Sequence, residues 1–275
     1  MKVYFNTWLK NEEDLLINVL PIWKNYPIDK FVFYNHDSTD NSIDIINTIL
    51  PKERVHIINN NYQSLNESLY RASMLNYSRE NKADYCFCID CDELLSSNLV
   101  DNFNEILKLY NDFDLKLYWY NVVENTLSRI RQDPLYLHNY RTFILPLNKT
   151  NNFDLSGWKY HVPRTPSINL PIQYTKEFGV LHLQAANKKF YAIKQLWYKH
   201  YENKEFGHDV DSINNAYDPV VNNLQFNAIN TPNNIFSNIK IDLKFYENLE
   251  IKKGYLSYIK NNYNEKLITF GKTYL

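Results

Sequence analysis

The sequence predicts an α/β protein in which a mostly parallel sheet carries helices on both faces and a helical extension follows at the C-terminus. Short apolar runs alternate with amphipathic segments over the first hundred residues, a pattern typical of right-handed βαβ units. Hydrophobic residues make up 44% of the 275 residues, which is enough for a large core and argues against general disorder. Phe190, Ile193, Trp197 and Tyr201 recur at helical spacing, so the last third of the chain is expected to contain helices.

The first elements follow from local patterns. A strand is expected at residues 2–8, and Asn11-Glu12-Glu13-Asp14 then opens a helix, because acidic residues in a first turn favour the positive end of the helix dipole. Pro21 inside this helix predicts a kink or an early end. The residues of this helix that are expected to be buried are Leu15, Leu16, Val19 and Trp23. The later elements expected in this half are a strand at 30–35, a helix around 43–50, a strand at 54–59, a helix at 69–78 and a strand at 85–89.

The pattern changes after residue 100. Further strands are expected between loops rich in Pro and Asn, at 115–123, 141–147, 157–162 and 179–184, followed by a helix at 186–204. From about Glu205 we expect a loop of Asn, Asp and Pro and then a helix around 242–262. We therefore predict one domain over residues 1–204, with halves at 1–100 and 101–204, and a helical extension at 205–275 that packs on the same domain.

Composition excludes several classes of function. The formal net charge is −1, so no basic surplus points to a nucleic acid or to an anionic membrane surface. The chain has only 5 Gly and neither a G-x-G-x-x-G nor a Walker sequence, which argues against a glycine-rich phosphate loop. No apolar run reaches transmembrane length and "MKVYFNTWLK" lacks a signal-peptide core, so a cytoplasmic location is expected.

The three cysteines, Cys86, Cys88 and Cys91, lie within one short stretch. Neighbours at i and i+2 on a strand are poorly placed for a disulfide, and a zinc site needs a second ligand pair that the sequence does not offer. We expect small buried apolar residues in a reducing compartment.

An apolar strand at 85–89 runs directly into Asp90, Asp92 and Glu93. Asp90 and Asp92 alternate with Cys91, so both can point to one side as the strand ends. Two close carboxylates repel each other, and a divalent cation removes that penalty. Mg²⁺ or Mn²⁺ suits such oxygen ligands and often bridges to substrate phosphates. The alternative is an acidic helix N-terminus with Asp92 or Glu93 as its cap.

These residues carry a resemblance to a known family. "NEEDLL", "IDKFVFYNHDSTDNS" and "YCFCIDCDELL" resemble the nucleotide-binding half of the family 2 glycosyltransferases, which have a GT-A (Rossmann-like) fold. The stretch from Asp90 to Leu94 matches the D-x-D-E-F variant of one subgroup. Arg141-Thr142-Phe143, "GWKYHV", "VLHLQ" and the helix with Lys194 are similar to that subgroup's second half in order. The resemblance covers about residues 1–200, with a nucleotide-binding half at 1–100 and an acceptor half at 101–204.

The resemblance implies a metal-dependent, inverting glycosyltransferase that moves a sugar from a nucleotide diphosphate sugar, with UDP-sugar as the expected donor, to a glycan acceptor. Mn²⁺ or Mg²⁺ is the implied cofactor. Two alternatives stay open: a nucleotidyltransferase, and a degenerate transferase that binds nucleotide sugars without turnover. The tail at 205–275 matches no family pattern; its aromatic side chains are expected to pack on the domain, with a cover for the acceptor groove or a homodimer contact as alternatives.

The resemblance also implies site residues. Those matched to the nucleotide site are Asn6 or Thr7, Asp37, Arg71 and Asp90, and those matched to the metal site are Asp92, His182 and Asp90. Each has a structural alternative. Asp37 or Ser38 would cap the following helix, Arg71 would be a solvated helix residue, and His182 would be a structural histidine on a strand.

The catalytic base is not fixed by the resemblance. The subgroup shows His-Glu where this chain has His161-Val162. An inverting transfer needs a base within hydrogen-bond reach of the acceptor hydroxyl. The candidates are therefore His161, Glu93 and Asp154, and Arg164 or Lys194 would offset the charge of the leaving group.

Overall fold

The computed structural model describes residues 1–60, 65–131, 139–153, 162–222, 228–232, 235–236, 238–247 and 251–272. The chain forms two compact units, and each is described by itself. The first unit comprises residues 1–119, 139–181 and 233–241, and the second comprises 120–138, 182–232 and 242–275. The predicted boundary between residues 204 and 205 stays a prediction.

The first unit contains a five-stranded sheet of order β3-β2-β1-β4-β9. Its strands are β1 (Val3–Leu9), β2 (Lys30–His36), β3 (Val55–Asn60), β4 (Tyr85–Cys88) and β9 (Ile144–Pro146). The first four run parallel and β9 is antiparallel to β4. The predicted α/β fold with a mostly parallel sheet is confirmed.

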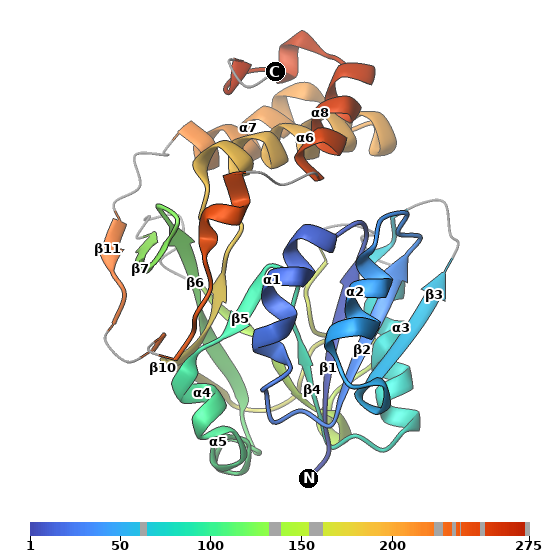
Figure 1. Ribbon diagram of the computed structural model, residues 1–275, viewed down its shortest axis with the longest axis vertical. Helices are drawn as coiled ribbons and strands as arrows, with labels where there is room; N and C mark the ends of the chain where they lie inside the picture. Colours follow the sequence, from blue (N-terminus) through green and yellow to red (C-terminus); the bar gives the residue numbers. More distant parts are fainter. Residues whose placement is uncertain are drawn as a thin grey trace. The chain divides into compact units, whose positions relative to one another are not determined.

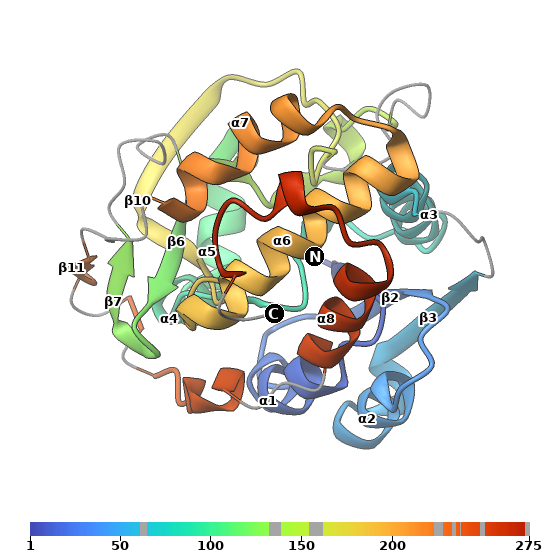
Figure 2. The ribbon, with the colours of Figure 1, turned by 90° about the horizontal axis from the view of Figure 1, so that it is seen from above.

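Helices cover both faces of this sheet. Successive side chains of a strand point to opposite faces: the Phe5 ring lies 4.8 Å from the Trp23 ring of α1 (Glu13–Trp23), and the Tyr4 ring lies 6.3 Å from the Tyr77 ring of α3 (Glu67–Glu80). The helix α2 (Ser42–Ile49) lies beside α1 on one face, and α3 lies on the other (Figure 1, Figure 2). The core is therefore built from two aromatic layers, as a sheet buried on both faces requires.

The start of α1 confirms the prediction from the acidic residues, since Glu13 and Asp14 occupy its first turn. Pro21 lies inside the helix, which ends two residues later at Trp23. This agrees with an early end, because proline lacks the N–H that would bond to the Ile17 carbonyl one turn earlier, and its ring crowds that carbonyl.

A second set of strands begins with β5 (Glu93–Leu95) and includes β6 (Asp114–Val123), β8 (Tyr140–Thr142) and β10 (Ile172–His182). In the first unit β10 lies between β5 and β6, and β8 is antiparallel to β6. The short helices α4 (Ser97–Asp101) and α5 (Phe103–Leu109) connect β5 to β6.

The strand predicted at 141–147 is in fact two strands. β8 pairs with β6 and β9 pairs with β4, so the chain changes sheets at Phe143, which is fully buried. The local pattern hides such a change because no turn residue separates the partly exposed β8 from the buried β9. The strand predicted at 157–162 falls almost entirely outside the described residues.

The second unit pairs the end of β6 with β7 (Thr126–Arg131), which pairs in turn with β11 (Ala228–Asn230). Its helices are α6 (Lys188–Phe206), α7 (Val210–Asn222) and α8 (Ile251–Asn261). The helix α6 contacts both α7 and α8 (Figure 2). Short 3-10 helices occur at Lys52–Arg54, Leu147–Lys149, Leu243–Glu247 and Glu265–Leu267.

The loop predicted after Glu205 is wrong over α7. Gly207 ends α6 in the left-handed region (φ 68°), as a helix C-terminus favours, and a new helix follows at once. Ile213 and Tyr217 are buried with Leu267 in one cluster. Tertiary packing outweighs the low helix propensity of Asn, Asp and Pro here.

Candidate functional site

The first sheet has a topological switch point between β1 and β4. The chain adds β2 and then β3 on one side of β1 and returns to place β4 on its other side. Ligands of open α/β sheets bind at the carboxyl ends of the strands at such a point. The carboxyl end of β4 is also where the acidic residues of the sequence lie.

Residues 90–93, here called the acidic turn, connect β4 to β5. The Glu93 N–H donates to the Asp90 carbonyl (3.1 Å), and the Asp90 N–H donates to the Glu93 carboxylate (2.9 Å). A strand follows, and the next helix begins only at Ser97. The alternative of an acidic helix N-terminus is therefore wrong.

Cys91 ties the acidic turn to the end of β1. Its Sγ lies 3.8 Å from the Thr7 hydroxyl and 3.6 Å from the Trp8 carbonyl oxygen. Cys86, Cys88 and Cys91 are all free and buried, and burial raises the pKa of the Cys88 thiol to about 12. They are inert thiols, as the sequence predicts.

Glu93 has no exposure to solvent. Its carboxylate accepts hydrogen bonds from Arg164, from the Trp119 indole N–H (2.6 Å) and from the Asp90 backbone. Burial raises the pKa of Glu93, and the Arg164 guanidinium opposes that rise. Because the Glu93 carboxylate is enclosed, it can hold Arg164 and Trp119 in position more readily than it can take a proton from the hydroxyl of a sugar acceptor.

Asp90 is shared by two arginines. Its Oδ2 lies 2.8 Å from Arg164 Nη2, and its Oδ1 lies 3.5 Å from Arg71 Nη2. Asp90 is 30% exposed, while the side chains of Arg164 and Arg71 are 14% and 6% exposed. One buried and one half-buried cation therefore converge on the more open acid at the switch point.

Arg71 comes from α3 and is not the solvated helix residue of the structural alternative. Besides Asp90 it meets Glu67, one helical turn earlier, at 3.8 Å. Within the part of the chain that the structure describes, its buried Nε has no hydrogen-bond acceptor. Buried guanidinium N–H groups usually find acceptors, so Arg71 retains unused capacity to bind an oxygen.

Asp92 is buried at 6% exposure. No group of three His, Cys, Asp or Glu side chains is arranged to hold a metal within the described ranges. A Mg²⁺ that is bound by one or two carboxylates and by phosphate oxygens does not need such a group. The metal role of Asp92 and Asp90 therefore stays a prediction of the resemblance.

The residues matched to the nucleotide base differ in exposure. Asn6 and Thr7 are buried, and the Asn6 Nδ2 donates to the Ser78 hydroxyl (3.2 Å). Asp37 is exposed and has φ 53°, a left-handed conformation that Asp tolerates. The start of α2 is held by Asp40, whose Oδ1 accepts from the Ser42 N–H (3.0 Å), so neither Asp37 nor Ser38 is needed as a cap.

His182 belongs to the second unit. It is buried, and its Nδ1 lies 2.8 Å from Asn121 Oδ1. Its role as a metal ligand stays a prediction of the resemblance. Asp154 and His161 lie outside the described residues.

The sequence did not indicate two residues that contact these charged side chains: Glu67, beside Arg71, and Trp119, beside Glu93. Glu67 stands four residues before Arg71, a spacing that places both on one helix face, so a signal was present. Trp119 lies within an apolar strand, where nothing in the local pattern marks its indole N–H as a partner of Glu93.

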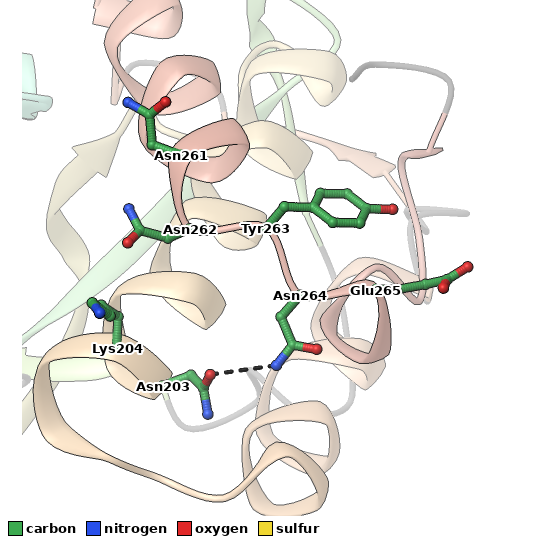
Figure 3. A pocket seen from close by; sticks show the side chains of 7 residues that line it. All are labelled: Asn203, Lys204, Asn261, Asn262, Tyr263, Asn264 and Glu265. Carbon is green, nitrogen blue, oxygen red and sulfur yellow. Dashed lines mark hydrogen bonds between the residues drawn. The ribbon is translucent and has the colours of Figure 1, made fainter.

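A shallow polar pocket in the second unit lies apart in the sequence from these residues (Figure 3). The residues that line it are Asn203, Lys204, Asn261, Asn262, Tyr263, Asn264 and Glu265. The amide of Asn262 donates to the Tyr258 carbonyl (3.0 Å), and the Asn264 amide donates to Asn203 Oδ1 (3.4 Å). These amides serve helix ends and each other, so the pocket offers no evident chemistry.

Comparison with known proteins gives a distant likeness. No family model matches the chain, and no curated protein does. The 1–349 fragment of S. aureus TarS matches at 12% identity with a TM-score of 0.47, over 74% of this chain and 66% of that one. The same fragment in complex with UDP-GlcNAc matches at 10% identity and a TM-score of 0.44, over 74% and 67%.

Mannosyl-3-phosphoglycerate synthase from Rubrobacter xylanophilus matches at 13% identity and a TM-score of 0.34, over 44% of this chain and 41% of that one. The chain thus spans just under two thirds of the TarS fragment, and it spans 39% of a longer TarS structure. Likeness at this level carries no argument about activity. Among the described residues, no helix is long and apolar enough to cross a membrane.

Proposed function

We propose that this chain is a metal-dependent glycosyltransferase that transfers a sugar from a UDP-sugar to a glycan acceptor with inversion. The observation that carries the proposal is the acidic turn at the switch point of the parallel sheet, with Arg71 and Arg164 directed at Asp90. Acids and fixed cations at one strand end suit a ligand that combines phosphates with a divalent cation.

The proposed roles follow the positions of the residues. Mg²⁺ or Mn²⁺ would be held by Asp92 and Asp90, where it offsets charge on the diphosphate leaving group. Asp37, the exposed residue that follows β2, would contact the nucleoside base, and Asn6 and Thr7 would support that end of the sheet from within. His161 or Asp154 would take the proton of the acceptor hydroxyl. The acceptor oxygen then bonds to the anomeric carbon while the bond to the diphosphate breaks.

Isothermal titration calorimetry tests the donor site. UDP, GDP and CMP are titrated into the full chain, each with and without MnCl₂. We expect UDP to bind most tightly and only with the metal present. A well-folded protein that gives no heat with any of the three would overturn the proposal.

Turnover separates the two alternatives. Release of UDP from a UDP-sugar supports the transferase, whereas release of pyrophosphate from a nucleoside triphosphate and a sugar phosphate identifies a nucleotidyltransferase. Binding of UDP-sugar without release of either product identifies a degenerate transferase. The cytoplasmic location and the homodimer remain predictions of the sequence.

A further inference from the structure

We propose that Asn11 is a positioning residue that holds Asp37 in place and thereby sets the preference of the site between nucleoside bases. Asn11 lies in the loop between β1 and α1 (residues 10–12), and Asp37 lies in the loop between β2 and α2 (residues 37–41). We call these two segments the paired loops. The role of Asn11 rests on the proposed function, in which Asp37 contacts the base.

Asn11 joins the paired loops through both its backbone and its side chain. Its N–H donates to the Ser38 hydroxyl (3.0 Å), and its Oδ1 accepts from the Thr39 N–H (2.7 Å). The Ser38 N–H donates in turn to Asn35 Oδ1 (3.0 Å), within β2. The residues before and after Asp37 are therefore both fixed, although Asp37 itself is exposed.

The helices that follow the paired loops depend on each other. Neither α1 nor α2 receives a side-chain hydrogen bond from its own N-cap residue, and the N–H groups at a helix start need acceptors. Asp40 Oδ2 accepts from the Glu13 N–H (3.0 Å) of α1, and Glu13 Oε2 accepts from the Asn41 N–H (2.9 Å) before α2. Because each helix start is bonded by the other segment, the two helices, which lie side by side (Figure 1), hold the paired loops together.

The backbone conformation points to the same two residues. Asn11 and Asp37 both have a left-handed backbone, with φ 56° and 53°. Such angles are uncommon outside glycine, although Asn and Asp tolerate them best. They persist where the surrounding structure holds them, and they gather at functional sites. The paired loops thus impose on Asp37 a conformation that the free chain would rarely adopt.

The chemistry of Asp37 predicts what this position selects. A carboxylate only accepts hydrogen bonds. Uracil can donate its ring N–H to it, whereas cytosine presents a lone pair at the equivalent nitrogen. A hydrogen bond weakens steeply when its angle is poor, so the preference for uracil depends on a carboxylate that is held still. The paired loops should therefore act on the ratio of UDP affinity to CDP affinity.

The first test changes Asn11 to glycine and measures both affinities. Asn11→Gly removes the acceptor for Thr39, and glycine adopts a left-handed φ readily, so the chain should fold. UDP and CDP are titrated calorimetrically into the full chain with MnCl₂. We expect the natural protein to prefer UDP, and Asn11→Gly to bind UDP about tenfold or more weakly, as for the loss of one hydrogen bond to a charged group, with CDP binding little changed.

Two further variants control for the backbone and for the side chain. Lys82→Gly changes another exposed residue with a left-handed φ (56°), between α3 and β4, and should leave both affinities unchanged. Asn11→Asp keeps an oxygen for the Thr39 N–H and tolerates the same backbone, so it should restore the natural ratio. Hydrogen exchange of residues 37–41, measured without nucleotide, should be faster in Asn11→Gly and close to natural in Asn11→Asp.

A double-mutant cycle separates positioning from general stability. In an Asp37→Asn background the carboxylate is already gone, so Asn11→Gly should change UDP affinity there by less than about twofold. A purely structural role would weaken UDP binding by the same factor in both backgrounds, and that result would overturn the role of Asn11.

The remaining outcomes are distinct. If Asn11→Gly folds, as checked by circular dichroism, and keeps either the natural ratio or the natural hydrogen exchange, the role of Asn11 is overturned while the proposed function stands. If the natural protein binds neither nucleotide, the proposed function and the role of Asn11 fail together.

Discussion

His36 ends β2 beside Asp37, and its ring is buried. The Tyr70 oxygen accepts from the Asn66 N–H (2.9 Å), and it lies 2.9 Å from His36 Nδ1. Where the Tyr70 hydroxyl donates to His36 Nδ1, that nitrogen is unprotonated and the ring is neutral. Burial, aided by Lys10, lowers the pKa of His36 to about 4.

The lowered pKa of His36 predicts acid sensitivity. The pKa of His36 in the folded chain lies below the ordinary histidine value of 6.5, so the unfolded chain binds the proton first as pH falls. The neutral ring costs no stability above pH 6.5, and the free energy of unfolding then decreases as pH falls towards about 4. After allowance for solvent screening, the loss is about 2 kcal/mol.

Urea denaturation at several pH values between these limits measures the effect. His36→Asn keeps an acceptor near Tyr70 but cannot take up the proton, so its stability should fall less steeply with acid than that of the natural protein. The matched control is His208→Asn, because His208 is an exposed histidine. Equal slopes for the natural protein and for His36→Asn would contradict the assignment.

Glu93 shows what sequence reasoning at the residue scale can and cannot reach. Its place after an apolar strand was enough to mark it as a site candidate, together with Asp90 and Asp92. Its enclosure was not readable, because the groups that enclose it, Trp119 and Arg164, stand 26 and 71 residues away in the chain. Local patterns place a carboxylate at a strand end, whereas its partners depend on how distant segments return.

At the scale of elements, α6 and α7 are joined by a buried charge. Lys199 has no exposure to solvent, and its Nζ lies 2.7 Å from both Asp218 Oδ1 and Thr269 Oγ1. Burial lowers the pKa of Lys199, and the bond to Asp218 opposes that effect. The pair links the centre of α6 to the last part of α7 and to the segment after α8.

Removal of the acid alone should therefore be costly. Asp218→Asn leaves the Lys199 ammonium buried without a counter-charge, and we expect a loss of about 3 kcal/mol in the free energy of unfolding. Lys199→Met together with Asp218→Asn removes both charges and should recover most of that loss. Lys204→Met, on the exposed side of α6, should change stability by less than about 0.5 kcal/mol.

Urea denaturation of the natural protein, of Lys199→Met and Asp218→Asn singly and of the double variant decides between a coupled pair and two independent sites, with Lys204→Met as the control. If the double variant is as unstable as the sum of its single changes, the charges are not coupled.

The sequence indicated this pair only by a lysine among apolar residues in a predicted helix. The sequence did not predict α7 itself, because Asn, Asp and Pro are typical of loops, and only the packing of Ile213 and Tyr217 makes that segment helical.

At the scale of the whole molecule, the parallel sheet of the first unit and the helices α6 and α8 of the second were predictable, whereas α7, β7 and β11 were not. Four parallel strands follow from apolar runs bounded by turn residues, and their alternation with helices fixes the sheet type. Strand order, the sheet change at Phe143 and the division into two units depend on contacts between segments far apart in the chain. Such contacts leave no periodic signal in one sequence.

Ligand binding should stabilise the folded chain as a whole, because a ligand that binds only the folded state shifts the unfolding equilibrium. UDP with Mn²⁺ at about 100 times the dissociation constant contributes about 2.7 kcal/mol, and in a chain of this size we expect a rise in Tm of about 5–10 °C. Asp92→Asn keeps the shape of the side chain but removes the charge that would hold the cation. Its Tm without ligand should stay close to that of the natural protein, and the rise with UDP and Mn²⁺ should disappear.

Asp101→Asn, an exposed acid at the end of α4, is the matched control and should retain the full rise. A full rise in Asp92→Asn would remove Asp92 from the metal site, since binding would then proceed without its charge.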